Sequence, residues 1–130
     1  MNVRRTELEG VRVIEPRIFG DARAGERYRG EEEPIDLRAG HVPGAVNVPF
    51  TGNLTAEAIP VFRPPEELRA RFVAVGADRS LPIVYCGSGV TACHDLLAMH
   101  AAGLRGRLYA GSWSEWSADP SLPVATGEKP

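Results

Sequence analysis

The chain has 130 residues, of which 43% are hydrophobic and 25% charged, with a formal net charge of −2. These values are typical of one globular domain that buries its own core. The charge balance excludes the basic surface of a nucleic-acid-binding protein, and no apolar run approaches the roughly 20 residues that cross a membrane. Residues 1–16 carry charges and lack the apolar segment of a secretory signal, so we expect a cytoplasmic protein with reduced thiols.

The first part of the chain predicts short strands and a long turn-rich loop. Residues 1–18 lack clear periodicity and are interpreted as an N-terminal extension or an edge strand, although strand candidates occur within 11–23. The stretch 21–45 is rich in glycine, proline and charge, which predicts a loop with one helical turn near Ala24. The sequence AVNVPF at 45–50 predicts another short strand.

A helix is predicted over residues 65–75. Proline at its first position and two glutamates in its first turn are typical of a helix start, and Gly76 is typical of a helix end. Its apolar residues recur at helical spacing and are expected to face the core. These residues are Leu68, Phe72 and Val75.

The last part of the chain alternates strands and helices. The pattern predicts a buried strand at 81–86, a helix at 91–103, a strand at 106–111 and a short helix at 112–118. The first of these helices is expected to turn one stripe toward the core, comprising Cys93, Leu96, Leu97 and His100. This alternation predicts an α/β domain over 19–127, with a mainly parallel central sheet flanked by helices on both faces and a tail at 128–130.

Cys86 stands at the point where the strand 81–86 leads into the next helix. Ligands of open parallel sheets bind beyond the carboxyl ends of the strands. Gly87 and Gly89 can take positive φ, which lets successive backbone N–H groups turn toward one centre. The helix start near Thr91 adds free N–H groups and a positive dipole end, so the loop predicts an anion cradle. A thiol in such a cradle has a lowered pKa, which favours an activated nucleophile over a buried structural cysteine.

Four sequence motifs together resemble the rhodanese sulfurtransferases. They are DARAGERYRG at 21–30, AGHVPGAVNVPF at 39–50, IVYCGSGVTA at 83–92 and GSWSEW at 111–116. More narrowly, the chain from about Phe19 to Gly127 is similar to the C-terminal catalytic domain of a two-domain mercaptopyruvate or thiosulfate sulfurtransferase. The resemblance implies a rhodanese-like α/β fold. It also implies transfer of sulfane sulfur from a small donor, through a persulfide on Cys86, to cyanide or a thiol.

The resemblance also implies which residues bind the donor. Arg27 lies at a motif position where the family has an arginine that binds the donor's anionic end. The loop residues Gly87, Ser88, Gly89, Val90 and Thr91 are expected to hold the donor and the anionic sulfur. The loop carries no charge and looks like the mercaptopyruvate type, because thiosulfate-type loops have basic residues after the cysteine. The family's mercaptopyruvate enzymes have a further arginine where this chain has Ile35, and Arg38 is the candidate replacement.

Several other residues of motif type are assigned structural roles. Asp21 is expected to cap backbone near a strand end, and His41 to bind a loop. Trp113 and Trp116 are expected to pack in the core, as is His100, whereas His94 is expected to face solvent. Two cysteines are too few for a four-cysteine zinc site, no carboxylate–histidine cluster has metal spacing, and no cofactor is expected.

Two other functions remain open from the sequence. A cysteine phosphatase of the same fold needs an arginine at the sixth position after the cysteine, which here is Ala92, and the loop looks one residue shorter. A non-enzymatic rhodanese-like interaction domain is the other alternative. The family's cleft lies between two similar domains, so this chain is either a nearly inactive isolated half or is completed by an N-terminal rhodanese-like domain or another chain.

Overall fold

The computed structural model describes residues 2–5, 12–15 and 19–130. Four parallel strands form the central sheet in the order β4 (Ala45–Asn47), β3 (Phe19–Asp21), β5 (Ile83–Tyr85) and β6 (Arg107–Leu108). Parallel pairing brings the carboxyl ends of β3, β4 and β5 to one edge, since Asp21 is level with both Asn47 and Tyr85. The loops that follow these strands therefore meet at that edge.

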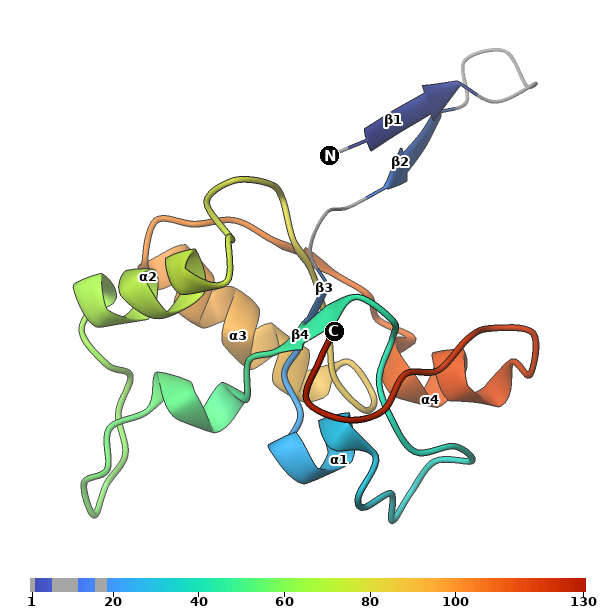
Figure 1. Cartoon of the computed structure of the whole chain (residues 1–130). Helices are drawn as coiled ribbons and strands as arrows, with labels where there is room; N and C mark the ends of the chain where they lie inside the picture. Colours follow the sequence, from blue (N-terminus) through green and yellow to red (C-terminus); the bar gives the residue numbers. More distant parts are fainter. Residues whose placement is uncertain (1, 6–11, 16–18) are drawn as a thin grey trace.

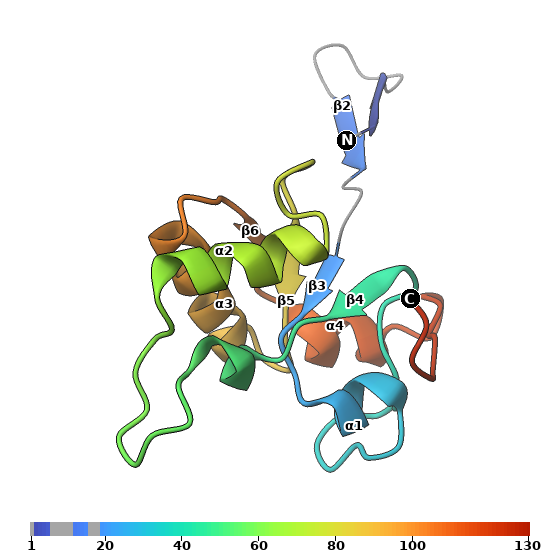
Figure 2. The same ribbon diagram turned by 60° about the vertical axis from the view of Figure 1, so that its left-hand side comes forward.

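Two strands lie outside this sheet. β1 (Asn2–Arg5) and β2 (Arg12–Glu15) pair antiparallel with each other and form a two-stranded sheet of their own. Figures 1 and 2 show it apart from the four-stranded sheet. The domain limits predicted at residues 18 and 127 stay a prediction.

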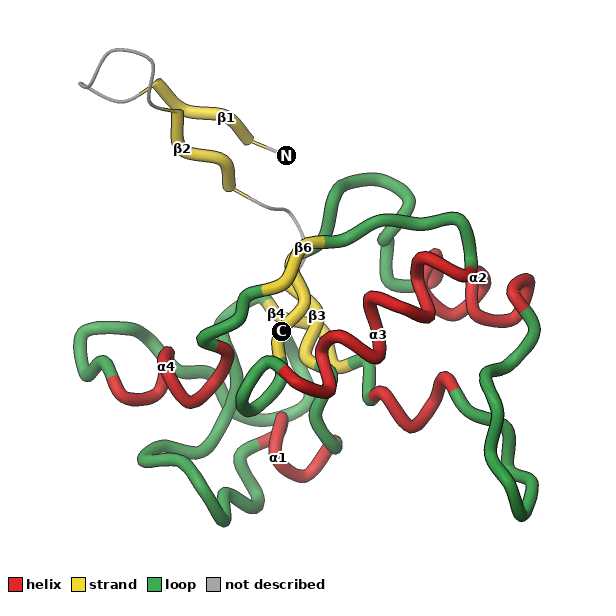
Figure 3. Tube along the Cα trace, turned by 180° about the vertical axis from the view of Figure 1, so that it is seen from behind, coloured by secondary structure: helices red, strands yellow, loops and turns green. Residues whose placement is uncertain are grey.

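Helices cover both faces of the central sheet (Figures 1 and 3). α2 (Pro65–Ala74) and α3 (Val90–Ala101) lie together on one face. α1 (Gly25–Arg29) and α4 (Ser112–Ala118) lie on the other. A short 3₁₀ helix, η1 (Phe50–Asn53), follows β4 and contacts α3. The predicted α/β fold with a parallel sheet flanked by helices is confirmed.

The alternation of side chains along β5 divides the core into two clusters. Val84 points to the face of α2 and α3, where it packs with Leu68, Phe72 and Met99. The next residue, Tyr85, points to the other face. The cluster there comprises Tyr28, Val42, Ala45, Tyr85 and Trp113, with Trp116 partly buried against it. The predicted core positions of α2 and of the two tryptophans are confirmed.

The predicted core stripe of α3 is wrong. Cys93, Leu97 and His100 are exposed, and only Leu96 of that stripe packs against the core. The buried face is instead formed by Ala92, Asp95, Ala98 and Met99. Three of these have small or unbranched side chains, which let the helix approach the sheet closely.

His94 does not face solvent as predicted. Its ring lies between Phe50 and Phe62, with centroid separations of 5.3 and 4.7 Å, and its Nδ1 is 3.2 Å from Nδ2 of Asn53.

Among the described residues there is no helix with the length and hydropathy to span a membrane.

Candidate active site

The loop after β5 is fixed in place by the start of α4. The carbonyl of Cys86 accepts a hydrogen bond from the N–H of Trp113 at 2.9 Å, and that of Gly87 accepts one from Ser114 at 3.0 Å. The Cys86 N–H donates to the Ser112 hydroxyl at 3.1 Å. A segment 26 residues further along the chain therefore sets the position of the thiol.

Gly89 makes the tight turn into α3 possible. Its φ is +88°, in the left-handed region that favours glycine, and it caps the helix that begins at Val90. A Cβ at this position would lie 2.6 Å from the carbonyl oxygen of Ala110. The Gly89 N–H donates to Sγ of Cys86 at 3.1 Å. Gly87 does not take positive φ, but a Cβ there would lie 3.2 Å from Nη1 of Arg27.

The surroundings of Cys86 favour its thiolate. Burial raises the pKa of the thiol, because the charged form loses water. The Thr91 hydroxyl and the N–H groups of Ala92, Ser88 and Gly89 lower the pKa by more, so it lies below its ordinary value. The predicted cradle is therefore present in the structure, and it holds a buried sulfur that ionises more readily than a free cysteine.

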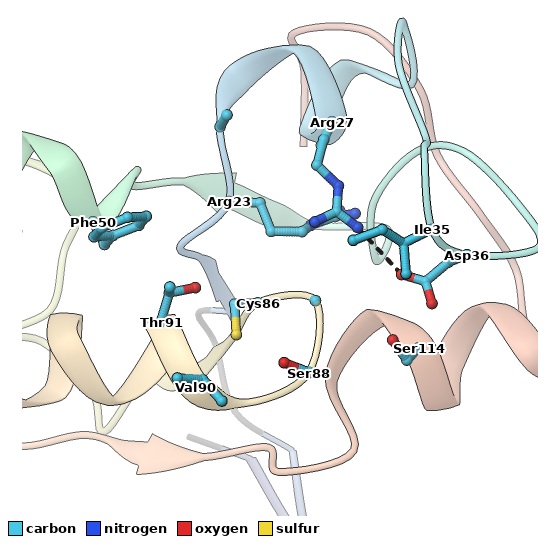
Figure 4. Close-up of a pocket in the computed structure, with 12 residues that line it drawn as sticks. Arg23, Arg27, Ile35, Asp36, Phe50, Cys86, Ser88, Val90, Thr91 and Ser114 are labelled. Atoms are coloured by element: carbon cyan, nitrogen blue, oxygen red, sulfur yellow. Dashed lines mark hydrogen bonds and ion pairs between the residues drawn. The ribbon is translucent and has the colours of Figure 1, made fainter.

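The thiol opens into a pocket of about 330 Å³ (Figure 4). The carboxyl-end loops of β3 and β5 supply most of its wall. The lining residues are Arg23, Ala24, Arg27, Ile35, Asp36, Phe50, Cys86, Gly87, Ser88, Val90, Thr91 and Ser114. This volume suits a small molecule.

Arg27 projects from α1 over the cysteine loop (Figure 4). Its Nη2 donates to Oε1 of Glu33 at 2.8 Å and to Oδ2 of Asp36 at 3.2 Å. Its Nε is buried and has no hydrogen-bond partner within the described part of the chain. A Cβ built on Gly87 would lie 3.2 Å from Nη1 and 3.5 Å from Nη2 of Arg27. Two carboxylates therefore hold Nη2, while the guanidinium as a whole lies beside the cysteine loop.

Arg23 also lines the pocket, but its guanidinium is fully engaged. It forms two-pronged hydrogen bonds with Asp21 at 2.7–3.2 Å, donates to the carbonyl of Gly40 at 2.6 Å, and lies 4.8 Å from the ring of Trp113. Asp21 also accepts the Arg23 N–H at 3.0 Å. Asp21 thus caps backbone as predicted and orients a buried arginine.

Arg38 does not replace the missing arginine at position 35. Its guanidinium donates to four backbone carbonyls after and within α4, those of Trp116, Ser117, Asp119 and Leu122, at 2.7–3.2 Å. It lies outside the pocket lining, whereas the exposed Ile35 belongs to it. The proposal that Arg38 binds the donor is therefore wrong.

His41 has the structural role predicted for it. Its Nδ1 is 2.8 Å from the carbonyl oxygen of Tyr28, and its Nε2 is 3.1 Å from that of Lys129. Its ring stacks on the Tyr28 ring at 3.8 Å. The buried histidine thus joins α1 to the C-terminal segment.

The sequence did not reveal five residues of the pocket wall: Arg23, Ala24, Asp36, Phe50 and Ser114. Arg23 stands beside Asp21 in the quoted DAR motif, so the motif itself contained a signal for it. Ser114 reaches the pocket through a long-range hydrogen bond to Gly87 that no local pattern encodes. Asp36 is brought there by the Glu33 turn and by Arg27, nine residues before it. No group of three or more possible metal ligands occurs among the residues the structure describes.

The fold and the site define an α/β domain whose cysteine lies at the carboxyl edge of a parallel sheet, in a loop that turns hydrogen-bond donors toward the sulfur. A family model described as a rhodanese-like domain matches residues 8–119. The chain therefore belongs to the rhodanese-like domain family, as its motifs predicted.

Several relatives are much longer than this chain. A probable 3-mercaptopyruvate sulfurtransferase of Pseudomonas aeruginosa is 56% identical over 111 residues, covering 83% of this chain and 38% of that protein. The thiosulfate sulfurtransferase of Bos taurus is 41% identical, over 83% of this chain and 38% of that protein. The solved 3-mercaptopyruvate sulfurtransferase of Leishmania major matches with a TM-score of 0.67 and 40% identity, covering 78% of this chain and 29% of that one. The chain thus spans less than two fifths of these relatives.

Proposed function

We propose that this domain is a sulfurtransferase that carries sulfane sulfur as a persulfide on Cys86. The observation that supports this most directly is the buried thiol, with its lowered pKa, at the wall of a pocket lined by Arg27 and the loop N–H groups. Relatives named for mercaptopyruvate and for thiosulfate sulfur transfer add to the argument.

The reaction proceeds in two displacements. The Cys86 thiolate attacks the transferable sulfur of the donor, and a sulfur–sulfur bond forms. With thiosulfate the donor's S–S bond breaks and sulfite leaves with the electron pair. With mercaptopyruvate the C–S bond breaks and pyruvate leaves as its enolate, which then takes a proton. The loop N–H groups stabilise the persulfide anion as they do the thiolate. Cyanide or a thiol then attacks the outer sulfur and the sulfur–sulfur bond breaks. The transferred sulfur leaves as thiocyanate or as a new persulfide, and the Cys86 thiolate is regenerated.

We assign donor binding to Arg27 and to the loop residues Gly87, Ser88, Gly89, Val90 and Thr91. Arg27 presents Nη1 beside the cysteine loop, where a donor anion can accept a charge-assisted hydrogen bond. Arg27→Ala should raise the donor KM on the order of tenfold. An unchanged donor KM would mean that Arg27 does not bind the donor and has only a structural role.

Mercaptopyruvate is the proposed preferred donor. The loop offers N–H groups but no lysine or arginine to match the second charge of thiosulfate. The exposed Ser88 side chain lies in the pocket wall, where its hydroxyl can donate to the leaving enolate. Replacing Gly87 and Ser88 by basic residues should shift kcat/KM toward thiosulfate. No shift would contradict this charge argument.

The partner of this domain is also a proposal. The relatives' greater length supports a second, N-terminal rhodanese-like domain or another chain that completes the cleft. We assign the reaction to the cytoplasm because persulfide chemistry needs a reduced thiol.

Sulfur transfer to cyanide, measured for the purified chain with and without an N-terminal partner domain, tests the function. We expect transfer that requires Cys86 and increases with the partner. If neither preparation transfers sulfur from either donor, the domain is an interaction module and the proposal is wrong.

A further inference from the structure

The wall of the pocket opposite the cysteine loop is built on a turn at residues 33–36. Oε1 of Glu33 accepts the N–H groups of Ile35 at 3.2 Å and Asp36 at 3.0 Å. The same oxygen accepts from Nη2 of Arg27 at 2.8 Å. Burial raises the pKa of Glu33, but these hydrogen bonds lower it by more, so Glu33 stays ionised at neutral pH. Glu33 therefore fixes both the turn and the arginine.

This turn places a second carboxylate against the same arginine. Oδ2 of Asp36 lies 3.2 Å from Nη2 of Arg27, and the Asp36 side chain is only 9% exposed. Unlike Glu33, Asp36 belongs to the pocket lining (Figure 4). A donor anion that approaches Arg27 therefore also approaches the Asp36 carboxylate.

The charges around the pocket do not favour an anion overall. Leaving the Cys86 sulfur aside, Arg23 and Arg27 contribute two positive charges, and Asp21, Glu33 and Asp36 contribute three negative ones, a formal net charge of −1. Asp21 and Glu33 are both needed to hold the two arginines. Asp36 is the carboxylate in excess of charge neutrality, and it is the only one of these three that lines the pocket.

We propose that Asp36 is a specificity-determining residue that selects singly charged sulfur donors against doubly charged ones. This inference rests on the proposed function of the pocket. The electrostatic penalty from one fixed negative charge is proportional to the charge of the ligand, so it is twice as large in free energy for a dianion. If Asp36 raises the Kd of a monoanion by a certain factor, it therefore raises the Kd of a dianion by the square of that factor. Arg27 supplies attraction to both, and Asp36 supplies the discrimination.

The alternative role for Asp36 is purely structural. In that case it would hold Arg27 in position, and its loss would weaken the binding of every anion. Asp36→Asn keeps the shape and an acceptor oxygen beside Arg27 but removes the charge. A structural role therefore predicts equal weakening of both anions or no change, whereas a selective role predicts tighter binding, with the larger change for the dianion.

The test is protection of Cys86 from alkylation by iodoacetamide, a neutral reagent. Sulfate serves as the dianion and pyruvate as the monoanion, each titrated at constant ionic strength in chloride. Alkylation of the peptide containing Cys86 is followed by mass spectrometry, which separates it from Cys93. Neither anion has a transferable sulfur, so the result does not depend on persulfide formation. Failure of sulfur transfer would contradict the proposed function separately.

We expect Asp36→Asn to tighten pyruvate binding about threefold and sulfate binding about tenfold. The matched control is Glu32→Gln, which removes a charge from an exposed side chain of the same loop, and screening should make its effect small. Weaker binding of both anions, equal changes for both, or no protection by either anion in either protein would each overturn the proposal. Unfolding curves of the variant identify any loss of fold.

Discussion

Thr91→Val tests how the cradle activates the thiol. The Thr91 hydroxyl is the largest of the hydrogen-bonding contributions that lower the pKa of Cys86, and valine has nearly the same shape without a donor. A hydrogen bond to a charged group contributes roughly 1.5–3 kcal/mol, and three backbone N–H groups remain to compensate for part of the loss. We therefore expect the pKa of Cys86 to rise by about one unit, which corresponds to about 1.4 kcal/mol.

The assay is the rate of Cys86 alkylation against pH, in a Cys93→Ala background so that one thiol reacts. The midpoint of the profile should move to higher pH in Thr91→Val. Thr91→Ser is the matched control, since it keeps the hydroxyl, and its midpoint should stay close to that of the parent. A midpoint in Thr91→Val that coincides with the parent would refute the view that the hydroxyl stabilises the thiolate.

Two further substitutions test residues outside the reaction. Arg38→Ala removes four hydrogen bonds to backbone carbonyls, so the free energy of unfolding should fall by roughly 2 kcal/mol. The donor KM should stay unchanged. A raised donor KM with an unchanged free energy of unfolding would instead show that Arg38 binds the donor. Asp95→Asn removes a buried carboxyl whose pKa is raised by burial from 3.8 to about 7. The folded parent holds that proton more tightly than the unfolded chain, so its stability should fall between about pH 4 and pH 7, by no more than about 4 kcal/mol. The free energy of unfolding of Asp95→Asn, measured with urea, should not show this fall. If the free energies of the two proteins change in parallel with pH, the raised pKa of Asp95 is contradicted.

The sequence was most informative where structure depends on neighbouring residues. The glycine turn after Cys86, the helix start beyond it and the proline-led α2 all follow from local preferences. The thiol cradle was predicted for the same reason, because its donors lie within six residues of the cysteine.

Long-range contacts explain what the sequence did not predict. The buried face of α3 includes Asp95, whose carboxyl accepts a hydrogen bond from Asn53, 42 residues away, at 2.7 Å. A hydrophobicity pattern assigns such a residue to the surface. The role of Arg38 was predicted wrongly because its hydrogen-bond partners lie about 80 residues further along the chain. Asp36 is a separate case, because its contacts are local: Glu33 holds the turn that brings it to Arg27, whereas composition alone describes a charged loop.

The central claim is that Cys86 is the sulfur carrier, and the most direct measurement is the mass of its peptide after reaction with a donor. The chain is incubated with mercaptopyruvate or thiosulfate, together with an N-terminal partner domain, and digested without reductant. We predict a gain of one sulfur atom on the peptide containing Cys86, loss of that gain in Cys86→Ser, and its retention in Cys93→Ser. Added sulfur on Cys93 alone, or transfer that persists in Cys86→Ser, would contradict the account.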